Sequence, residues 1–203
     1  MLVLLLFNQC SNDKNYTING QVLEAYLGDN IANVDLSVYF SELNGGVYST
    51  GYTLVAEATT NSEGKFELKF DEVSAVDFLL RVEKKGYFTR EFIFQRNDWQ
   101  VNEKNTELLR IYETAQLNVK IVGTTSQWKY LFKLADHSEE CETCCEVSSY
   151  VVERGIQDDK VCDVFANQTI NYEYTNLLLG EGSKKTGSIF IKPGLNLVEI
   201  NVN

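Results

Sequence analysis

A strict alternation of apolar and charged residues at positions 65–70 constrains this chain most. The segment reads Lys-Phe-Glu-Leu-Lys-Phe. A period of two buries one face of a β-strand and leaves the other in solvent. The four residues before it, Asn-Ser-Glu-Gly at 61–64, predict a tight turn, because Gly64 can take a positive φ. We therefore expect antiparallel β-structure here, with residues 56–60 as the hairpin partner.

Short alternating segments separated by turn residues recur along the whole chain. They lie at 18–22, 34–38, 117–121, 188–192 and 194–202, and further strands are expected at 78–82, 128–134 and 169–174. Asn44-Gly45 is a strong hairpin dipeptide, and no stretch has the 3.6-residue period of a long helix. The 203 residues suffice for two cores of about a hundred residues each. We expect an all-β fold of two consecutive Greek-key β-sandwich domains, residues 16–113 and 114–203.

The charge and the histidine content exclude several classes of function. A net charge of −11 argues against nucleic acid as a partner, because such binding needs Lys and Arg to neutralise phosphates. It equally disfavours peripheral binding to anionic lipid. His137 is the single histidine, so a Ser-His-Asp or Cys-His arrangement could be built only on its loop. We expect a protein that is not an enzyme and has no cofactor.

The N-terminus combines an apolar run, Met1 to Phe7, with Cys10 and a polar stretch at 11–15. This order resembles a bacterial lipoprotein signal. The resemblance implies that residues 1–10 are a signal peptide and lipidation site, that Cys10 carries the lipid, and that 11–15 form a tether. It also implies an outer-membrane lipoprotein of the cell envelope, held in the membrane by its lipid anchor. The alternative is an apolar first strand of a cytoplasmic protein, with Cys10 as a buried thiol.

Four short patterns in the first half of the chain occur in the same order in a known family. They are Ile18-x-Gly20-x-Val22, I-x-x-V-x-L-x-V at 31–38, T-N-x-x-G-x-F at 60–66 and Gly86-Tyr87. Residues 16–113 thus resemble the carboxypeptidase regulatory-like domain, which implies a transthyretin-like, seven-strand Greek-key sandwich. In that family such modules accompany peptidase domains or occur on bacterial surface and outer-membrane transport proteins. These patterns are turn and core signatures, so the resemblance implies no chemistry.

The cysteines of the second half indicate structural disulfides. Cys141, Cys144, Cys145 and Cys162 are an even number of thiols once Cys10 is set aside,. In an oxidising compartment we expect two bridges. Geometry disfavours a bridge between the neighbours Cys144 and Cys145. Two pairings remain: Cys141–Cys144 with Cys145–Cys162, or Cys141–Cys145 with Cys144–Cys162.

Alternative interpretations place a ligand or a reaction on the chain. His137 and the cysteines could ligate zinc, or Cys141-x-x-Cys144 could be a redox pair. A carbohydrate-binding surface could be built from the aromatic residues Tyr48, Tyr52, Trp99 and Trp128, although a tryptophan on a predicted strand more often belongs to the core. Of these, Trp99 lies in a polar loop and is the one expected to be exposed for ligand contact. The leading hypothesis is a binding or assembly accessory of the envelope, with a protein partner there and no metal.

Overall fold

A computed structural model describes residues 14–44, 47–48, 51–123, 128–135, 144–145, 150–154 and 159–202. This part of the chain is built from strands and one 3₁₀ turn, η1 (Glu181–Ser183), so the expected all-β class is confirmed. The described residues include no helix that is long and apolar enough to span a membrane. Two compact units are formed. Unit 1 comprises residues 1–23, 30–83 and 89–109, and unit 2 comprises 24–29, 84–88 and 110–203.

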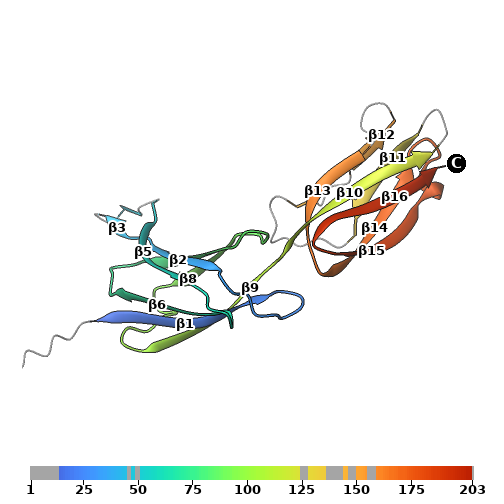
Figure 1. The fold of residues 1–203 in the computed structure, drawn as a ribbon. Helices are drawn as coiled ribbons and strands as arrows, with labels where there is room; N and C mark the ends of the chain where they lie inside the picture. The colour runs from blue at the N-terminus through green and yellow to red at the C-terminus, as the bar shows by residue number, and fades with distance from the viewer. Residues whose placement is uncertain are drawn as a thin grey trace, which may run out of the picture. The chain divides into compact units, whose positions relative to one another are not determined.

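Unit 1 is a sandwich of a three-stranded and a four-stranded sheet (Figure 1). The first has the order β6-β1-β9, formed by Lys65–Asp71, Asn15–Glu24 and Lys104–Ile111. The second has the order β5-β2-β7-β8, formed by Thr53–Thr59, Asp35–Phe40, Asp77–Glu83 and Arg90–Gln95. A small hairpin joins β3 (Leu43–Asn44) to β4 (Val47–Tyr48), as the Asn44-Gly45 dipeptide predicted.

The strand β6 buries the face that its alternation predicted, but it has a different partner. Phe66, Leu68 and Phe70 are buried. However, β6 pairs with β1, with Phe66 opposite Gly20, whereas β5 pairs with β2. The predicted hairpin between residues 56–60 and 65–70 is therefore wrong, and the turn at 61–64 carries the chain from one sheet to the other. Alternation identifies the buried face of a strand, not the neighbour to which its backbone bonds.

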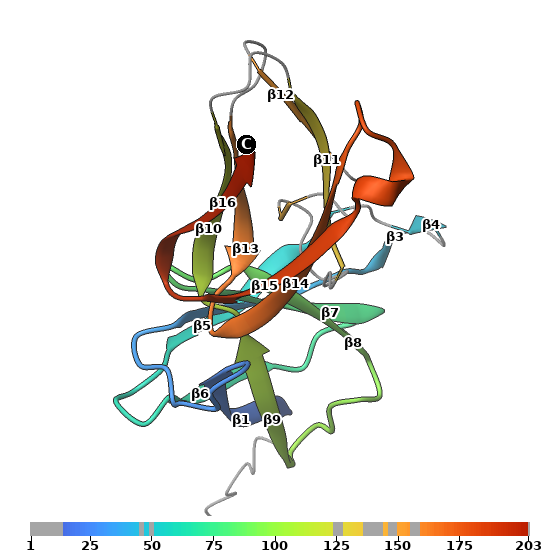
Figure 2. The ribbon, with the colours of Figure 1, turned by 90° about the vertical axis from the view of Figure 1, so that its right-hand side faces the viewer.

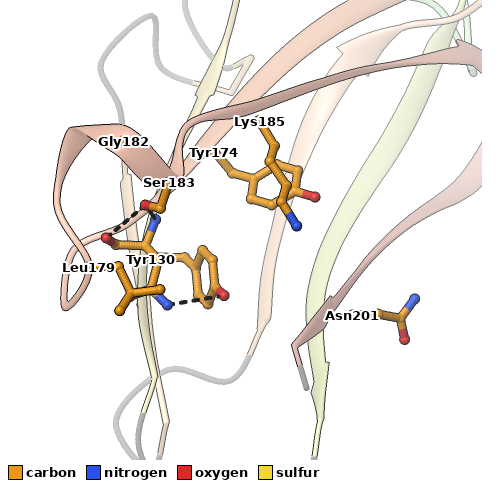
Figure 3. Close-up of a pocket in the computed structure, with 8 residues that line it drawn as sticks. Tyr130, Tyr174, Leu179, Gly182, Ser183, Lys185 and Asn201 are labelled. Atoms are coloured by element: carbon orange, nitrogen blue, oxygen red, sulfur yellow. Dashed lines mark hydrogen bonds between the residues drawn. The ribbon is translucent and has the colours of Figure 1, made fainter.

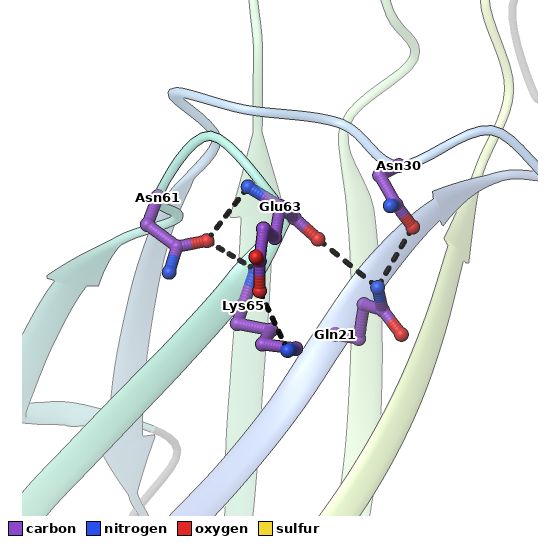
Figure 4. Close-up of polar contacts among 5 residues, drawn as sticks. All are labelled: Gln21, Asn30, Asn61, Glu63 and Lys65. Carbon is purple, nitrogen blue, oxygen red and sulfur yellow. Dashed lines mark hydrogen bonds and ion pairs between the residues drawn. The ribbon is translucent and has the colours of Figure 1, made fainter.

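The turn at 61–64 is closed by side-chain hydrogen bonds that explain its sequence (Figure 4). The Asn61 carbonyl Oδ1 accepts from the backbone N–H of Glu63 at 2.9 Å and of Lys65 at 3.0 Å. Gln21 donates its Nε2 to the Glu63 backbone oxygen at 3.0 Å. Gly64 has a φ of 72°, and a Cβ there would lie 2.8 Å from the backbone oxygen of Val22. The position therefore requires glycine for two independent reasons.

Thr60, the first residue of the same pattern, fastens the segment that leads into β2. Its buried hydroxyl donates to the Ile31 carbonyl at 2.8 Å and accepts from the Val34 N–H at 2.9 Å. Its own N–H donates to the Val34 carbonyl at 3.0 Å. The T-N-x-x-G-x-F pattern thus holds the sandwich together and leaves no polar group of Thr60 for a ligand.

Unit 2 repeats the strand order of unit 1. Figure 2 shows its two sheets on opposite sides of the sandwich. The three-stranded sheet is β13-β10-β16, formed by Asp159–Phe165, Thr114–Gly123 and Gly194–Val202. The four-stranded sheet is β12-β11-β14-β15, formed by Tyr150–Glu153, Lys129–Leu134, Gln168–Asn176 and Lys185–Ile191.

Counting strands along each unit, without the β3–β4 hairpin, gives the sheet orders 4-1-7 and 3-2-5-6 in both units. The fourth strand returns to lie beside the first, which is a Greek-key connection. The two sandwiches expected from the strand pattern are confirmed. The halves are topological copies, although their sequences show no register of identity.

Trp99 belongs to the core of unit 1, so its predicted exposure as a ligand contact is wrong. It is 2% exposed, and its ring stacks on Phe94 at a centroid distance of 4.6 Å. Its indole Nε1 donates to the Glu107 carboxylate at 2.9 Å. The Asn105 side chain bonds the backbone of Gln100 at 2.7 Å, which closes the loop around the ring. A polar loop can bury an indole when its N–H has an acceptor.

The core of unit 2 contains the other tryptophan, as its position beside a predicted strand indicated. Trp128 is 6% exposed and lies with the inward-facing side chains of both sheets. Of the remaining aromatic residues considered for a sugar-binding surface, Tyr52 is exposed, and the side chain of Tyr48 lies outside the description. Because Trp99 and Trp128 are both buried, neither tryptophan is available for the proposed aromatic surface.

Candidate functional site

The cysteines of unit 2 form disulfides. Cys145 is bonded to Cys162 with a Cα–Cα distance of 5.0 Å, and Cys144 is also disulfide-bonded. The backbone N–H of Cys145 donates to the Asp163 carbonyl at 2.8 Å, which lays the Cys144-Cys145 segment against β13. The pairing of Cys144 with Cys162 is therefore wrong, and the alternative containing Cys145–Cys162 remains.

These bonds remove most of the donors that a zinc site would need. A cysteine ligates zinc as a thiolate, and Cys144, Cys145 and Cys162 are all oxidised. Within the described ranges no three His, Cys, Asp or Glu side chains are grouped to hold a metal ion. The zinc hypothesis is wrong for these three cysteines. The remaining predicted positions, Cys10, His137 and Cys141, lie outside the described residues.

Unit 2 has an open hollow of about 400 Å³ beside β14 and β15 (Figure 3). Its lining combines two tyrosines, an aliphatic side chain, a lysine and small polar residues. These are Tyr130, Tyr174, Asn176, Leu179, Gly182, Ser183, Lys185 and Asn201. We refer to this site as the tyrosine hollow.

Strand register brings the lining residues together. β14 lies between β11 and β15, and Tyr174 is opposite Phe132 on one side and Lys185 on the other. Tyr130 is opposite Asn176 in the same sheet, and its hydroxyl accepts from the Asn176 Nδ2 at 3.3 Å. Directly opposite residues of an antiparallel pair project from the same face. The tyrosines and the lysine are thus positioned by the sheet rather than by a loop.

A row of aromatic rings leads from the core of unit 2 into the tyrosine hollow. Phe132 is fully buried and stacks on Tyr172 at 5.4 Å. Tyr172 stacks on Tyr174 at 6.4 Å, and Tyr174 lies 6.0 Å from Tyr130. Burial raises the pKa of Tyr172, and the neighbouring Tyr174 hydroxyl adds to this rise. The apolar core therefore continues into an accessible surface.

The ring of Tyr172 covers a glycine on the adjacent strand. Gly187 is its cross-strand partner, and a Cβ at that position would lie 2.5 Å from the Tyr172 Cζ. In unit 1, Phe66 covers Gly20 in the same way, with 2.5 Å between such a Cβ and the Phe66 Cζ. An aromatic side chain over a cross-strand glycine stabilises a strand position that has no side chain of its own.

Backbone and side-chain hydrogen bonds hold the loop at one edge of the hollow, residues 176–183. The Asn176 carbonyl accepts from the N–H groups of Leu179 and Gly180, both at 3.1 Å. The Ser183 hydroxyl accepts from the Asn176 N–H at 2.9 Å and lies 2.7 Å from the Gly180 carbonyl. The polar groups of Asn176 and Ser183 are thus used within the loop and, through the Asn176 Nδ2, by Tyr130. The segment Leu177–Leu179 is left 41%, 58% and 74% exposed.

Lys185 and Tyr174 provide uncommitted polar groups on two neighbouring strands of the hollow. The neighbouring Lys184 pairs with Glu173 at 2.6 Å, and this hydrogen bond lowers the pKa of the Glu173 carboxyl. Lys185 has no ion pair with any described residue, and the Tyr174 hydroxyl has no hydrogen bond there. No carboxylate is among the described lining residues. The described lining of the hollow therefore offers hydrogen-bond donors to a ligand.

A second hollow, of about 330 Å³, lies over β2 and β5 of unit 1. It is lined by Asp35, Leu36, Ser37, Glu57, Ala58 and Thr59. The Asp35 carboxylate already accepts from the Thr59 hydroxyl at 3.0 Å, and no aromatic side chain lines the site. The tyrosine hollow is therefore the better candidate.

Sequence reasoning did not identify the residues of the tyrosine hollow. The available signal was Tyr172-x-Tyr174 on one predicted strand and Lys184-Lys185 before the next. Neither pattern is distinctive, since alternating tyrosines are common in strands and paired lysines are common on surfaces.

No protein-family model and no curated protein matches this sequence. Among solved structures, the Bacillus anthracis TIE protein superimposes with a TM-score of 0.40 at 11% identity, over 93% of this chain and 33% of that one. A variant of shaft pilin SpaA from Lactobacillus rhamnosus GG gives 0.37 at 11% identity, over 95% and 98% of the two chains. The minor pilin GBS52 of Streptococcus agalactiae gives 0.35 at 14% identity, over 92% and 94%.

This chain thus spans about one third of the TIE protein's length. TM-scores of 0.40 and below do not establish a common fold with any of the three proteins. The class of the present chain follows from its own strands: it is an all-β protein of two Greek-key sandwiches.

Proposed function

We propose that this chain is a non-catalytic binding protein of the bacterial cell envelope, with its ligand held in the tyrosine hollow of unit 2. The observation that carries the proposal is the hollow itself. It continues an aromatic core, and it presents the amine of Lys185 and the hydroxyl of Tyr174 without partners among the described residues. Pockets that combine apolar surface with a few convergent polar groups are typical ligand sites.

The proposed location rests on the cysteines. Cys144, Cys145 and Cys162 are all in disulfides, and structural disulfides persist in oxidising, extracytoplasmic compartments. The resemblance of the first ten residues to a lipoprotein signal supports export, with Cys10 as the lipidated residue of an outer-membrane protein. Mass spectrometry of the mature N-terminus tests this. An acylated chain that begins at Cys10 is expected, and an unmodified chain that begins at Met1 would contradict the anchor.

Binding at the hollow can be tested without knowing the ligand. The full mature chain is titrated with a panel of monosaccharides and small polar metabolites while the NMR signals of Tyr130, Tyr174 and Lys185 are followed. At least one compound should shift these signals and leave those of the hollow over β2 and β5 unchanged. If no compound of the panel moves the signals of the tyrosine hollow, its proposed role is wrong.

A protein partner in the envelope is the second candidate function, and the segment Leu177–Leu179 favours it. Three consecutive exposed leucines on a hydrogen-bonded loop are unusual on a protein surface,. Replacing Leu178 by Asp should leave the unfolding midpoint nearly unchanged, because the residue is 58% exposed, and should abolish crosslinks from this loop to a partner in intact cells. Unaltered crosslinking of the variant would argue against this role.

A further inference from the structure

The tyrosine hollow presents two adjacent hydrogen-bond donors. Tyr174 and Lys185 are directly opposite each other on β14 and β15, and Figure 3 shows the Lys185 side chain beside the ring of Tyr174. An ammonium group has three donors and a phenol has one, and neither group is committed to a described residue,. A carboxylate has two acceptor oxygens and can bond both donors at once, with the stronger bond going to the ammonium group.

The local charge also favours an anion. The chain carries a net charge of −11, yet Lys185 is the one charged side chain among the described residues that line the hollow. The adjacent Lys184 is neutralised by Glu173 at 2.6 Å and does not line the hollow. Lys185 itself is exposed, and its ammonium group attracts a ligand of opposite charge because no described carboxylate pairs with it,.

The rest of the lining selects a ligand with both an apolar face and hydroxyl groups. The ring of Tyr174 and the side chain of Leu179 supply apolar surface, and Asn201 supplies an amide with no hydrogen-bond partner in the described part of the chain. The volume of about 400 Å³ is near the lower end of the range for ligand pockets. A pyranose ring has an apolar C–H face that packs on aromatic rings and a polar rim of hydroxyl groups, so it matches this combination.

We propose that the tyrosine hollow binds an acidic sugar, a uronic acid residue whose carboxylate is held by Lys185 and the Tyr174 hydroxyl. This inference rests on the proposed function, because it names the ligand class of the same site. It assigns the charge recognition to Lys185, the ring contact to Tyr174 and Tyr130, and no part to Lys184.

The chain contains its own matched control in the two adjacent lysines. The full chain is titrated with glucuronate and galacturonate, with glucose and galactose as neutral counterparts, and with acetate as a carboxylate without a ring. Each titration is repeated for Lys185→Met, Lys184→Met and Tyr174→Phe. The signals of the hollow are followed by NMR, and dissociation constants are taken from the titration curves.

We expect each uronate to bind at least about tenfold more tightly than its neutral counterpart, because a hydrogen bond to a charged group is among the stronger ones in proteins. Lys185→Met should abolish this preference, and Lys184→Met should leave it unchanged. Tyr174→Phe keeps the ring and removes one donor, so it should weaken uronate binding severalfold with little effect on the neutral sugar.

Four other outcomes would overturn the inference in distinguishable ways. Equal binding of uronates and neutral sugars in the hollow would refute charge recognition but leave the proposed function standing. Binding of acetate as tight as that of uronates would refute sugar recognition. An equal loss of affinity in Lys184→Met and Lys185→Met would show a general charge effect instead of a site. Failure of all five compounds to shift the hollow's signals would refute the acidic-sugar ligand, whereas the proposed function is refuted only if the wider panel also fails.

Discussion

Removing the Cys145–Cys162 disulfide should destabilise unit 2 and leave unit 1 unchanged. The bridge joins residues separated by 17 positions. Closing a loop of that size lowers the entropy of the unfolded chain enough to stabilise the folded state by about 3 kcal/mol. For a domain of about a hundred residues, this corresponds to a fall in Tm of roughly 12–24 °C. The double substitution Cys145→Ala, Cys162→Ala isolates this bridge, because it leaves Cys144 in place.

The two tryptophans of the chain allow each unit to be followed separately. Trp99 is buried in unit 1 and Trp128 is buried in unit 2, and the chain has no others. The Cys145→Ala, Cys162→Ala substitution is made in a Trp99→Phe background, which reports unit 2, and in a Trp128→Phe background, which reports unit 1. Urea unfolding is followed by fluorescence, and each variant is compared with its own single-tryptophan parent.

We expect the Trp128 transition to lose about 3 kcal/mol and the Trp99 transition to stay within about 0.5 kcal/mol of its parent. A loss below about 1 kcal/mol in unit 2 would show that the bridge constrains an unfolded state that is already compact. Equal losses in both transitions would show that the two units unfold as one. Either result would refute the reasoning.

Three further predictions test Gly64, Gly20 and the half-buried Tyr172. Gly64→Ala should destabilise unit 1 by more than about 2 kcal/mol, because it adds a close contact with the Val22 carbonyl to the strain of a positive φ,. Gly86→Ala is the control: φ is also positive there but no atom lies within 4 Å, so it should cost only about 1 kcal/mol. Equal losses of stability in urea unfolding would contradict the role of the Val22 contact. Gly20→Ala should cost unit 1 at least about 1–3 kcal/mol, because the added Cβ would lie 2.4 Å from the Glu107 backbone oxygen and 2.5 Å from the Phe66 ring. An unchanged Trp99 transition would contradict this expectation. Burial raises the pKa of Tyr172 above its ordinary value of 10.0, so the contribution of this residue to the stability of unit 2 should be constant below pH 10 and should be lost as the pH rises further. Tyr172→Phe should flatten the fall in stability above pH 10, and an unaltered profile would assign that fall to other groups.

The sequence alone determined which residues form strands and which face of each strand is buried. Residues 65–70 alternate in the sequence, and Phe66, Leu68 and Phe70 are buried in the structure. The glycine at position 64 was predicted to take a positive φ, and it does. These features could be predicted because each depends on local geometry: a strand has a period of two, and a left-handed backbone favours glycine.

Tertiary structure alone decided which strands pair, which cysteines bond and where a ligand can bind. Residues 65–71 pair with β1 across more than forty positions of sequence. Cys162 bonds Cys145 and not the adjacent Cys144. Trp99 is buried although its loop is polar. Tyr130, Tyr174 and Lys185 come from three strands whose register is set by backbone hydrogen bonds over the whole sheet. The convergence of these three side chains depends on the whole fold, because no local sequence pattern shows which strands are neighbours in a sheet.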